Sequence, residues 1–171
     1  MHGSRGEGYP PSVHASGRIE CSPLSLMRRP HPELLTFAGR VLAHEAERSP
    51  RSRLTPFENA CAALQRHLDR MIGLRGFHAL LSRAIFLTRA EHPWLAPLRV
   101  SDQNGCALEG VADAMKAGAG EAPAGFAAVI ATMTTLLASF IGEDLTIRLL
   151  REAWPDVPIE SNLLPEGSMY E

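Results

Sequence analysis

The sequence predicts an all-α protein, a bundle of about five helices with a small β-hairpin insert. The stretch from Ala122 to Gly142 contains no charged residue and is long enough for one helix of about five turns or more. Apolar residues recur at spacings of three and four over most of the chain between Pro32 and Trp154, which is the helical period. Only the segment 94–110 differs, since short apolar runs there flank the turn-forming pair Asn104-Gly105.

Length and composition indicate one soluble domain. The 171 residues, of which 45% are hydrophobic and 21% charged, can close a single core. The formal net charge of -2 gives no general electrostatic reason to bind nucleic acid or an acidic membrane surface. The three cysteines lie far apart and lack the paired short spacings of a zinc site. We therefore expect a cytoplasmic protein with free thiols, no export signal and no membrane span.

The chain divides into three parts by composition. Residues 1–31 are rich in Gly, Pro, Ser and His, have hardly any apolar periodicity, and are expected to be a disordered N-terminal tail. Met27 stands just before the first helical pattern, so translation can start there or at Met1. Residues 32–158 are expected to form one helical bundle domain, and residues 159–171 a C-terminal tail that is polar apart from Ile159 and Leu163-Leu164.

Two helices are predicted at the start of the bundle. The first runs over residues 32–48, and its predicted buried stripe consists of Leu34, Leu35, Ala38, Val41 and Leu42. The second begins at Thr55-Pro56-Phe57-Glu58, which has Thr at the cap, Pro at the first helical position and Glu three residues after the cap. Its apolar spacing continues to Ile72.

Glycines and prolines divide the rest of the bundle. We expect a turn rather than a kink at Gly73, followed by a third helix that Pro93 ends. After the hairpin, residues 112–117 can form a short helical turn before the central helix over residues 122–142. Glu143 and Asp144 then open a last helix that reaches Trp154, with acids at its positive N-terminal end. This last helix is expected to be largely buried.

An internal duplication is a further hypothesis. An offset of 69 residues aligns residues 57–85 with residues 126–154 and gives eight identities, where chance gives about three in such helices. The two segments share the pair Ile-Gly at their centre, as Ile72-Gly73 in the first and Ile141-Gly142 in the second. Shared amphipathic patterning explains the matches equally well. Both explanations predict two helical hairpins that pack face to face.

The central helix has two unlike sides. Large apolar residues form one stripe: Phe126, Ile130, Met133, Leu137 and Phe140. The opposite side is small, with Ala128, Thr132, Thr135 and Ser139 at the same spacing. A second helix can approach such a side closely. Alternatively, Thr132, Thr135 and Ser139 line a pocket for a small apolar molecule.

No constellation in the sequence predicts catalysis, a metal or a cofactor. A nucleophile elbow, a phosphate-binding glycine loop and a dinucleotide fingerprint are all missing from the sequence. Four histidines lie on or beside helices, but none has a ligand partner one turn away: His44, His67, His78 and His92. The acids Glu143 and Asp144 are interpreted as helix caps, with Asp144 paired to Arg148, rather than as a general-base pair. We expect that the protein is not an enzyme.

The function we expect is polypeptide binding by a regulatory or interaction module. Phe86 and Leu87 fall partly off the stripe of their helix and Trp94 follows a proline, so these three form the candidate interaction surface. The partner is another protein or a second copy in a homodimer. A ligand-sensing bundle is one alternative. The other is a DNA-binding regulator that uses the arginine-rich second and third helices, which the net charge and the apolar third helix disfavour.

Overall fold

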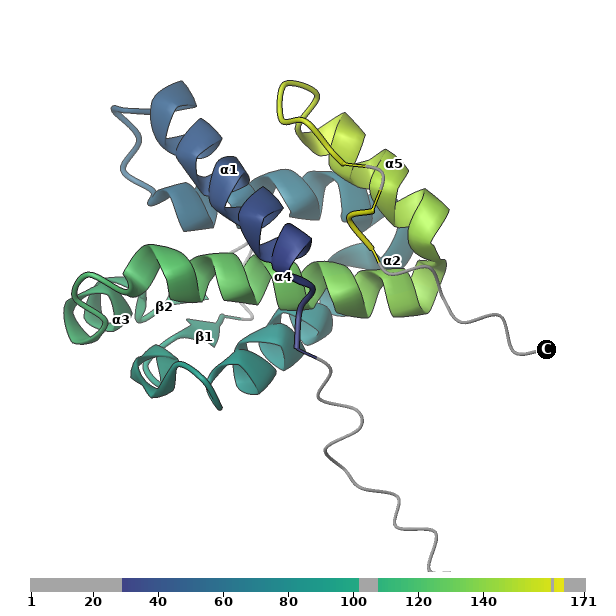
Figure 1. The fold of residues 1–171 in the computed structure, drawn as a ribbon. Helices are drawn as coiled ribbons and strands as arrows, with labels where there is room; N and C mark the ends of the chain where they lie inside the picture. Colours follow the sequence, from purple (N-terminus) through teal and green to yellow (C-terminus); the bar gives the residue numbers. More distant parts are fainter. Residues whose placement is uncertain (1–28, 102–107, 161, 165–171) are drawn as a thin grey trace, which may run out of the picture.

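The computed structural model describes residues 29–101, 108–160 and 162–164 of the chain. The described residues form an all-α bundle with a two-stranded antiparallel sheet at one end (Figure 1). The elements in order are α1 (Pro32–Arg48), α2 (Pro56–Thr88), the short 3-10 helix η2 (Pro93–Leu95), β1 (Arg99–Val100), β2 (Leu108–Glu109), α3 (Val111–Ala117), α4 (Ala122–Ile141) and α5 (Glu143–Ala153). The predicted fold class is thereby confirmed.

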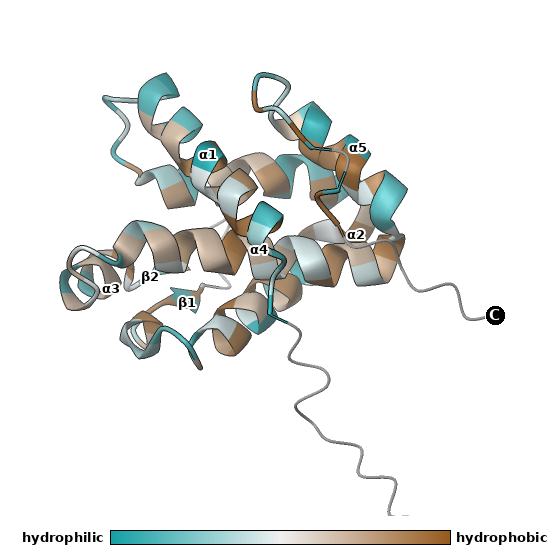
Figure 2. Ribbon diagram, viewed as in Figure 1, coloured by the Kyte–Doolittle hydropathy of each residue, from teal (hydrophilic) through white to brown (hydrophobic). Residues whose placement is uncertain are grey.

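Helix α4 is the centre of the bundle, because α1, α2 and α5 all pack against it. Figure 2 shows hydrophilic residues gathered on the outer turns of α1 and α5, whereas α4 is mostly hydrophobic. The predicted stripe is buried at Phe126, Ile130, Met133 and Leu137. Phe140 departs from it and is 78% exposed, because no described helix covers that side of the last turn of α4.

The composition of α4 also meets the criterion for a membrane span. Its most apolar 18-residue window has a mean hydropathy of 1.9, and 61% of that window is buried inside the bundle. One such helix is weak evidence for a membrane, because the core helix of a soluble protein has the same length and composition.

Helix α1 has the predicted bounds but a slightly rotated buried face. Leu34, Ala38, Val41 and Leu42 are buried as predicted, whereas Leu35 is 38% exposed. Phe37, at the opposite edge of the stripe from Leu35, and Glu45, near its centre, are buried as well. The spacing 34, 38, 41, 45 marks the centre of the face that meets the core, and Leu35 lies at its edge.

Helix α2 begins with the predicted capping box. The Thr55 hydroxyl accepts a hydrogen bond from the Glu58 amide (3.2 Å), and the Glu58 carboxylate accepts one from the Thr55 amide (2.7 Å). Gly73 interrupts the helix with φ 67° and ψ 170°, values that only glycine adopts readily. The break separates residues 56–72 from residues 74–88, so Gly73 is a kink between two helical segments of α2, where the sequence favoured a turn.

Two observations support the duplication. Gly142, the residue equivalent to Gly73, has nearly the same backbone conformation, with φ 88° and ψ 159°. The equivalent residues Phe57 and Phe126 stack on each other, with ring centroids 4.5 Å apart and planes 14° apart.

The hairpin insert packs next to α2. Strand β1 pairs with β2 in the register Arg99 to Glu109 and Val100 to Leu108. The predicted turn at Asn104-Gly105 lies outside the described residues. Arg89 fixes the segment before β1, because its guanidinium donates hydrogen bonds to the carbonyl oxygens of Leu95 (3.4 Å) and Leu98.

The C-terminal part packs on α1. Helix α5 buries one face and exposes the other, at Arg148, Arg151 and Glu152, so the expectation of a largely buried helix is wrong: its charged residues need water. Beyond α5, Trp154 is fully buried and its Nε1 donates a hydrogen bond to Glu45 Oε1 at 2.8 Å. Leu163 and Leu164 are also buried, so chain after Pro158 contributes to the core.

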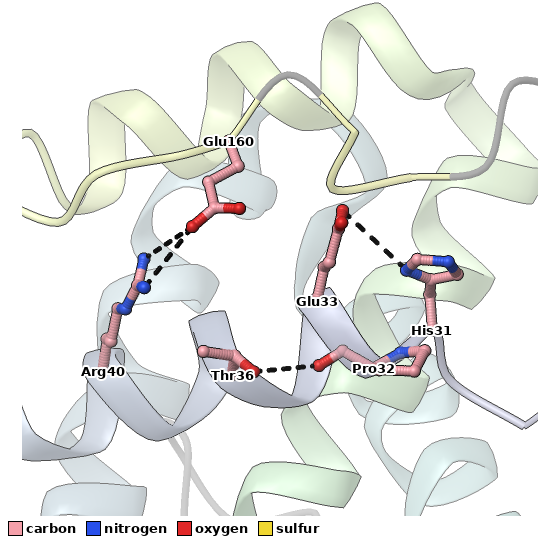
Figure 3. A network of polar contacts seen from close by, with 6 residues as sticks. All are labelled: His31, Pro32, Glu33, Thr36, Arg40 and Glu160. Carbon is pink, nitrogen blue, oxygen red and sulfur yellow. Dashed lines mark hydrogen bonds and ion pairs between the residues drawn. The ribbon is translucent and has the colours of Figure 1, made fainter.

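A polar contact also joins this C-terminal segment to the outer side of α1. The guanidinium of Arg40 lies 3.4 Å from Glu160 Oε1, as Figure 3 shows. Both side chains are largely exposed, so the pair contributes little to stability. The apolar contacts beneath it are what hold the segment.

Candidate binding groove between α1 and α4

An open groove lies beside the crossing of α1 and α4. Its volume is about 940 Å³, and its walls come from α1, from the residues just before α1, from the first half of α4 and from the turn after α2. The lining residues are Arg29, Pro30, His31, Pro32, Leu34, Leu35, Thr36, Gly39, Glu91, His92, Pro123, Ala124, Ala127, Ala128 and Thr135. Most of these are apolar.

Small residues make the groove wide. Gly39 on α1 faces open space, since a Cβ atom built on it meets nothing within 4 Å. Ala124, Ala127 and Ala128 contribute only methyl groups from α4. Where the small side of α4 is buried, as at Ala128 (7% exposed), it packs against α1. Where α1 diverges from α4, the same side lines the groove.

The three residues expected to line a pocket have different surroundings. Thr135 lines the groove, and its hydroxyl donates a hydrogen bond to the Ala131 carbonyl (3.0 Å). Thr132 faces α2 instead, where its hydroxyl oxygen accepts a hydrogen bond from Thr88 at 3.3 Å. Ser139 is exposed and donates to the Thr135 carbonyl (3.0 Å). Of the three, only Thr135 contributes to the groove.

The charged residues of the groove stand at its rim. Arg29 Nε lies 2.9 Å from Glu91 Oε1, which joins the chain before α1 to the turn after α2. Their side chains are 84% and 48% exposed, so the attraction is screened by water. His31 Nδ1 lies 3.9 Å from Glu33 Oε2 at the start of α1 (Figure 3). The floor is uncharged and the rim is polar.

The candidate surface of Phe86, Leu87 and Trp94 consists of dissimilar residues. Phe86 is 58% exposed, with the Arg83 guanidinium carbon 5.7 Å from its ring centre, and Leu87 is half-buried. Trp94 packs edge-on against Phe126, with ring centroids 5.8 Å apart. Its indole also covers two glycines, Gly118 and Gly125, so closely that an added Cβ would lie within 2.5 Å of it.

Trp94 therefore joins the segment after α2 to the start of α4. Its Nε1 is buried and has no hydrogen-bond partner among the described residues. Phe86 is the most exposed of the three residues, and it points away from the core on the outer side of α2.

No catalytic arrangement is found among the described residues. They contain no group of three or more His, Cys, Asp or Glu side chains that could hold a metal ion. Within that part of the chain, Asp144 and Arg148 form no ion pair, so no arginine orients the acids at the start of α5. The buried carboxylate of Glu45 accepts the indole hydrogen bond of Trp154, which ties α1 to the C-terminal segment.

The groove was not predicted from the sequence, although one signal was present. Leu35 stands one position off the centre of the α1 stripe, and Gly39 follows it by one turn, on the same side of the helix. This pair marks a part of α1 that the core does not cover. The other walls come from distant parts of the chain.

Comparison of the chain with protein-family models, with curated proteins and with solved structures found no match. The functional conclusion therefore depends on the chemistry of the surface.

Proposed function

We propose that this chain is a non-enzymatic binding module whose groove between α1 and α4 holds part of a polypeptide partner. One observation carries the proposal: a groove of about 940 Å³ with an apolar floor and a polar rim. Protein interfaces have this arrangement, with an apolar centre surrounded by polar residues. Burial of apolar surface there contributes about 25 cal/mol per Å² in favour of the complex, against which the freedom lost on association counts. The proposal keeps the cytoplasmic location expected from the sequence.

The lining of the groove supports binding rather than catalysis. Its acid and its arginine, Glu91 and Arg29, pair with each other. The hydroxyls of Thr36 and Thr135 donate hydrogen bonds to carbonyl oxygens of their own helices. Hydrolysis or group transfer needs a nucleophile, a base and an orienting group in contact, and the described lining supplies no such set.

A small apolar molecule is the second candidate for the groove. The volume lies at the upper end of the roughly 300–1,000 Å³ range of small-molecule pockets, and Thr135 lines it. Such pockets bury most of the ligand, however, and this groove is open to solvent, which favours a polypeptide. A second copy of the chain is one form the partner can take.

Cysteine footprinting tests the proposal. Ala124 lines the groove and is exposed, while Ala46 is an exposed alanine of α1 outside it. We expect a cysteine at Ala124 to be alkylated about tenfold more slowly in the native cytoplasm than in the purified protein, with no difference for a cysteine at Ala46. Native mass spectrometry then separates a polypeptide from a small apolar molecule. Equal alkylation of the Ala124→Cys variant in both settings contradicts the proposal.

A further inference from the structure

The described chain begins at the rim of the groove. Arg29 and Pro30, the first two described residues, both belong to the lining of the groove. Arg29 Nε lies 2.9 Å from Glu91 Oε1, so the side chain of Arg29 reaches the turn after α2. Residues 1–28 precede Arg29 and lie outside the described part of the chain. Apolar residues shortly before Arg29 are therefore tethered beside the apolar floor.

An uncharged run with three large apolar residues stands directly before Arg28. Residues 22–27 read Ser-Pro-Leu-Ser-Leu-Met. Leu24 and Leu26 alternate with Ser25, so an extended backbone presents both leucines on the same side. Because the run carries no charge, it brings no ionised group that would lose its water on the uncharged floor. The segment next to the groove thus matches the floor in chemistry.

Length and tethering both allow this run to reach the floor. Along α4 the lining extends from Pro123 to Thr135, which is about 18 Å at a rise of about 1.5 Å per residue. Six extended residues span about 20 Å, at roughly 3.3 Å each. A short tether keeps the local concentration of such a segment in the millimolar range, so even a weak contact is well populated. A separate polypeptide has to compete with this local concentration.

The first turns of α1 and α4 offer hydrogen bonds to an extended backbone. Among the described residues neither turn has a side-chain cap, and both contribute to the lining, for example at Leu34 and Ala124. The N–H groups in the first turn of a helix have no partner within that helix. Carbonyl oxygens of an extended segment can accept hydrogen bonds from them. The segment then exchanges part of its hydrogen bonds to water for hydrogen bonds to the protein.

We infer that, in the chain that begins at Met1, residues 22–27 occupy the groove as an extended segment with Leu24 and Leu26 on the floor between α1 and α4. This inference rests on the proposed function, because it names a competitor for the same groove. A separate partner binds only after the segment has left. The apparent affinity for that partner is therefore reduced in proportion to the fraction of chains in which the groove is open.

Alkylation of a cysteine at Ala124 in the purified full chain tests the inference, with the rate measured at that residue by peptide mass spectrometry. Ala124 lines the groove and is exposed. The test variant carries Leu24→Asp and Leu26→Asp, which would bring two carboxylates onto an apolar floor. The matched control carries Val13→Asp and Ile19→Asp, which make the same change of charge and a similar change of hydrophobicity at a greater distance along the chain from Arg29.

We expect the cysteine at Ala124 to be alkylated at least about threefold faster in the test variant than in the parent and the control, because the parent's tethered segment covers this residue for most of the time. A chain shortened to start at Met27 lacks both leucines and should react as fast as the test variant. A cysteine at Ala46, which is exposed and outside the groove, should react equally in all four proteins. Equal rates at Ala124 in all four, or an equal acceleration in the control, overturn the inference.

Failure of the inference and failure of the proposed function give different results. Equal rates in the purified parent and test variant, together with slow alkylation of the parent in the native cytoplasm, overturn the inference and assign the groove to a separate polypeptide. Equal rates in the purified proteins and in the cytoplasm overturn both.

Discussion

The variant Gly125→Ala changes two opposing contributions to the free energy of unfolding. Alanine is the better helix former, by about 1 kcal/mol inside a helix. The added Cβ, however, would lie 2.3 Å from Cζ2 and 2.6 Å from Cη2 of Trp94. The indole cannot move aside freely, because Phe126 and Gly118 contact it as well. Overpacking costs about 1–3 kcal/mol, and an overlap this deep belongs to the upper part of that range. We expect a net loss of about 1–2 kcal/mol.

Urea unfolding measures this loss as a lower midpoint at an unchanged slope. The control is the same substitution in a Trp94→Ala background, where the obstacle is gone and Gly125→Ala should stabilise by about 1 kcal/mol. The double-mutant cycle should therefore give an interaction energy of about 2–3 kcal/mol. The reasoning is refuted if Gly125→Ala stabilises the protein equally in both backgrounds, because the indole then does not lie over this glycine.

Two further predictions concern the core and a third concerns the membrane. Leu137→Ala should lower the free energy of unfolding by about 2–5 kcal/mol, since Leu137 is 2% exposed, whereas Phe140→Ala on the same helix should lower it by less than about 0.5 kcal/mol. Equal losses of stability in thermal melting would contradict the described burial. Trp154→Phe should lower the free energy of unfolding by about 1–3 kcal/mol, because it leaves the buried Glu45 without its 2.8 Å hydrogen bond. Adding Glu45→Leu should recover part of this loss, and no recovery would mean that lost packing dominates. Cell fractionation should recover the protein without detergent, and recovery only with detergent would make α4 a membrane helix.

The helices and their ends could be predicted from the sequence because the forces that set them act over a few residues. Thr55 and Glu58 form the capping box that their spacing predicts. Gly73 and Gly142 break the helices where the apolar pattern is interrupted, since their positive φ suits glycine alone. These features need no knowledge of how the helices pack.

The surface could not be predicted because it depends on how distant elements pack. Which side of α1 is buried depends on the way it crosses α4, so Leu35 is exposed and Phe37 is buried against expectation. The Trp154 to Glu45 hydrogen bond joins residues 109 positions apart, and nothing local marks either one. The groove has walls from three such elements, so only its α1 side left a signal in the sequence.

The central claim is that a polypeptide occupies the groove, and site-specific photo-crosslinking in the native cytoplasm tests it most directly. A photoreactive residue at Ala124 should give a polypeptide adduct, while one at Ala46 should give none. The adduct should disappear when Gly39→Leu fills the groove, a change the structure accommodates because Gly39 faces open space. An adduct that survives Gly39→Leu, or one that forms instead from Ala79 on the outer side of α2 that carries Phe86, would contradict the claim.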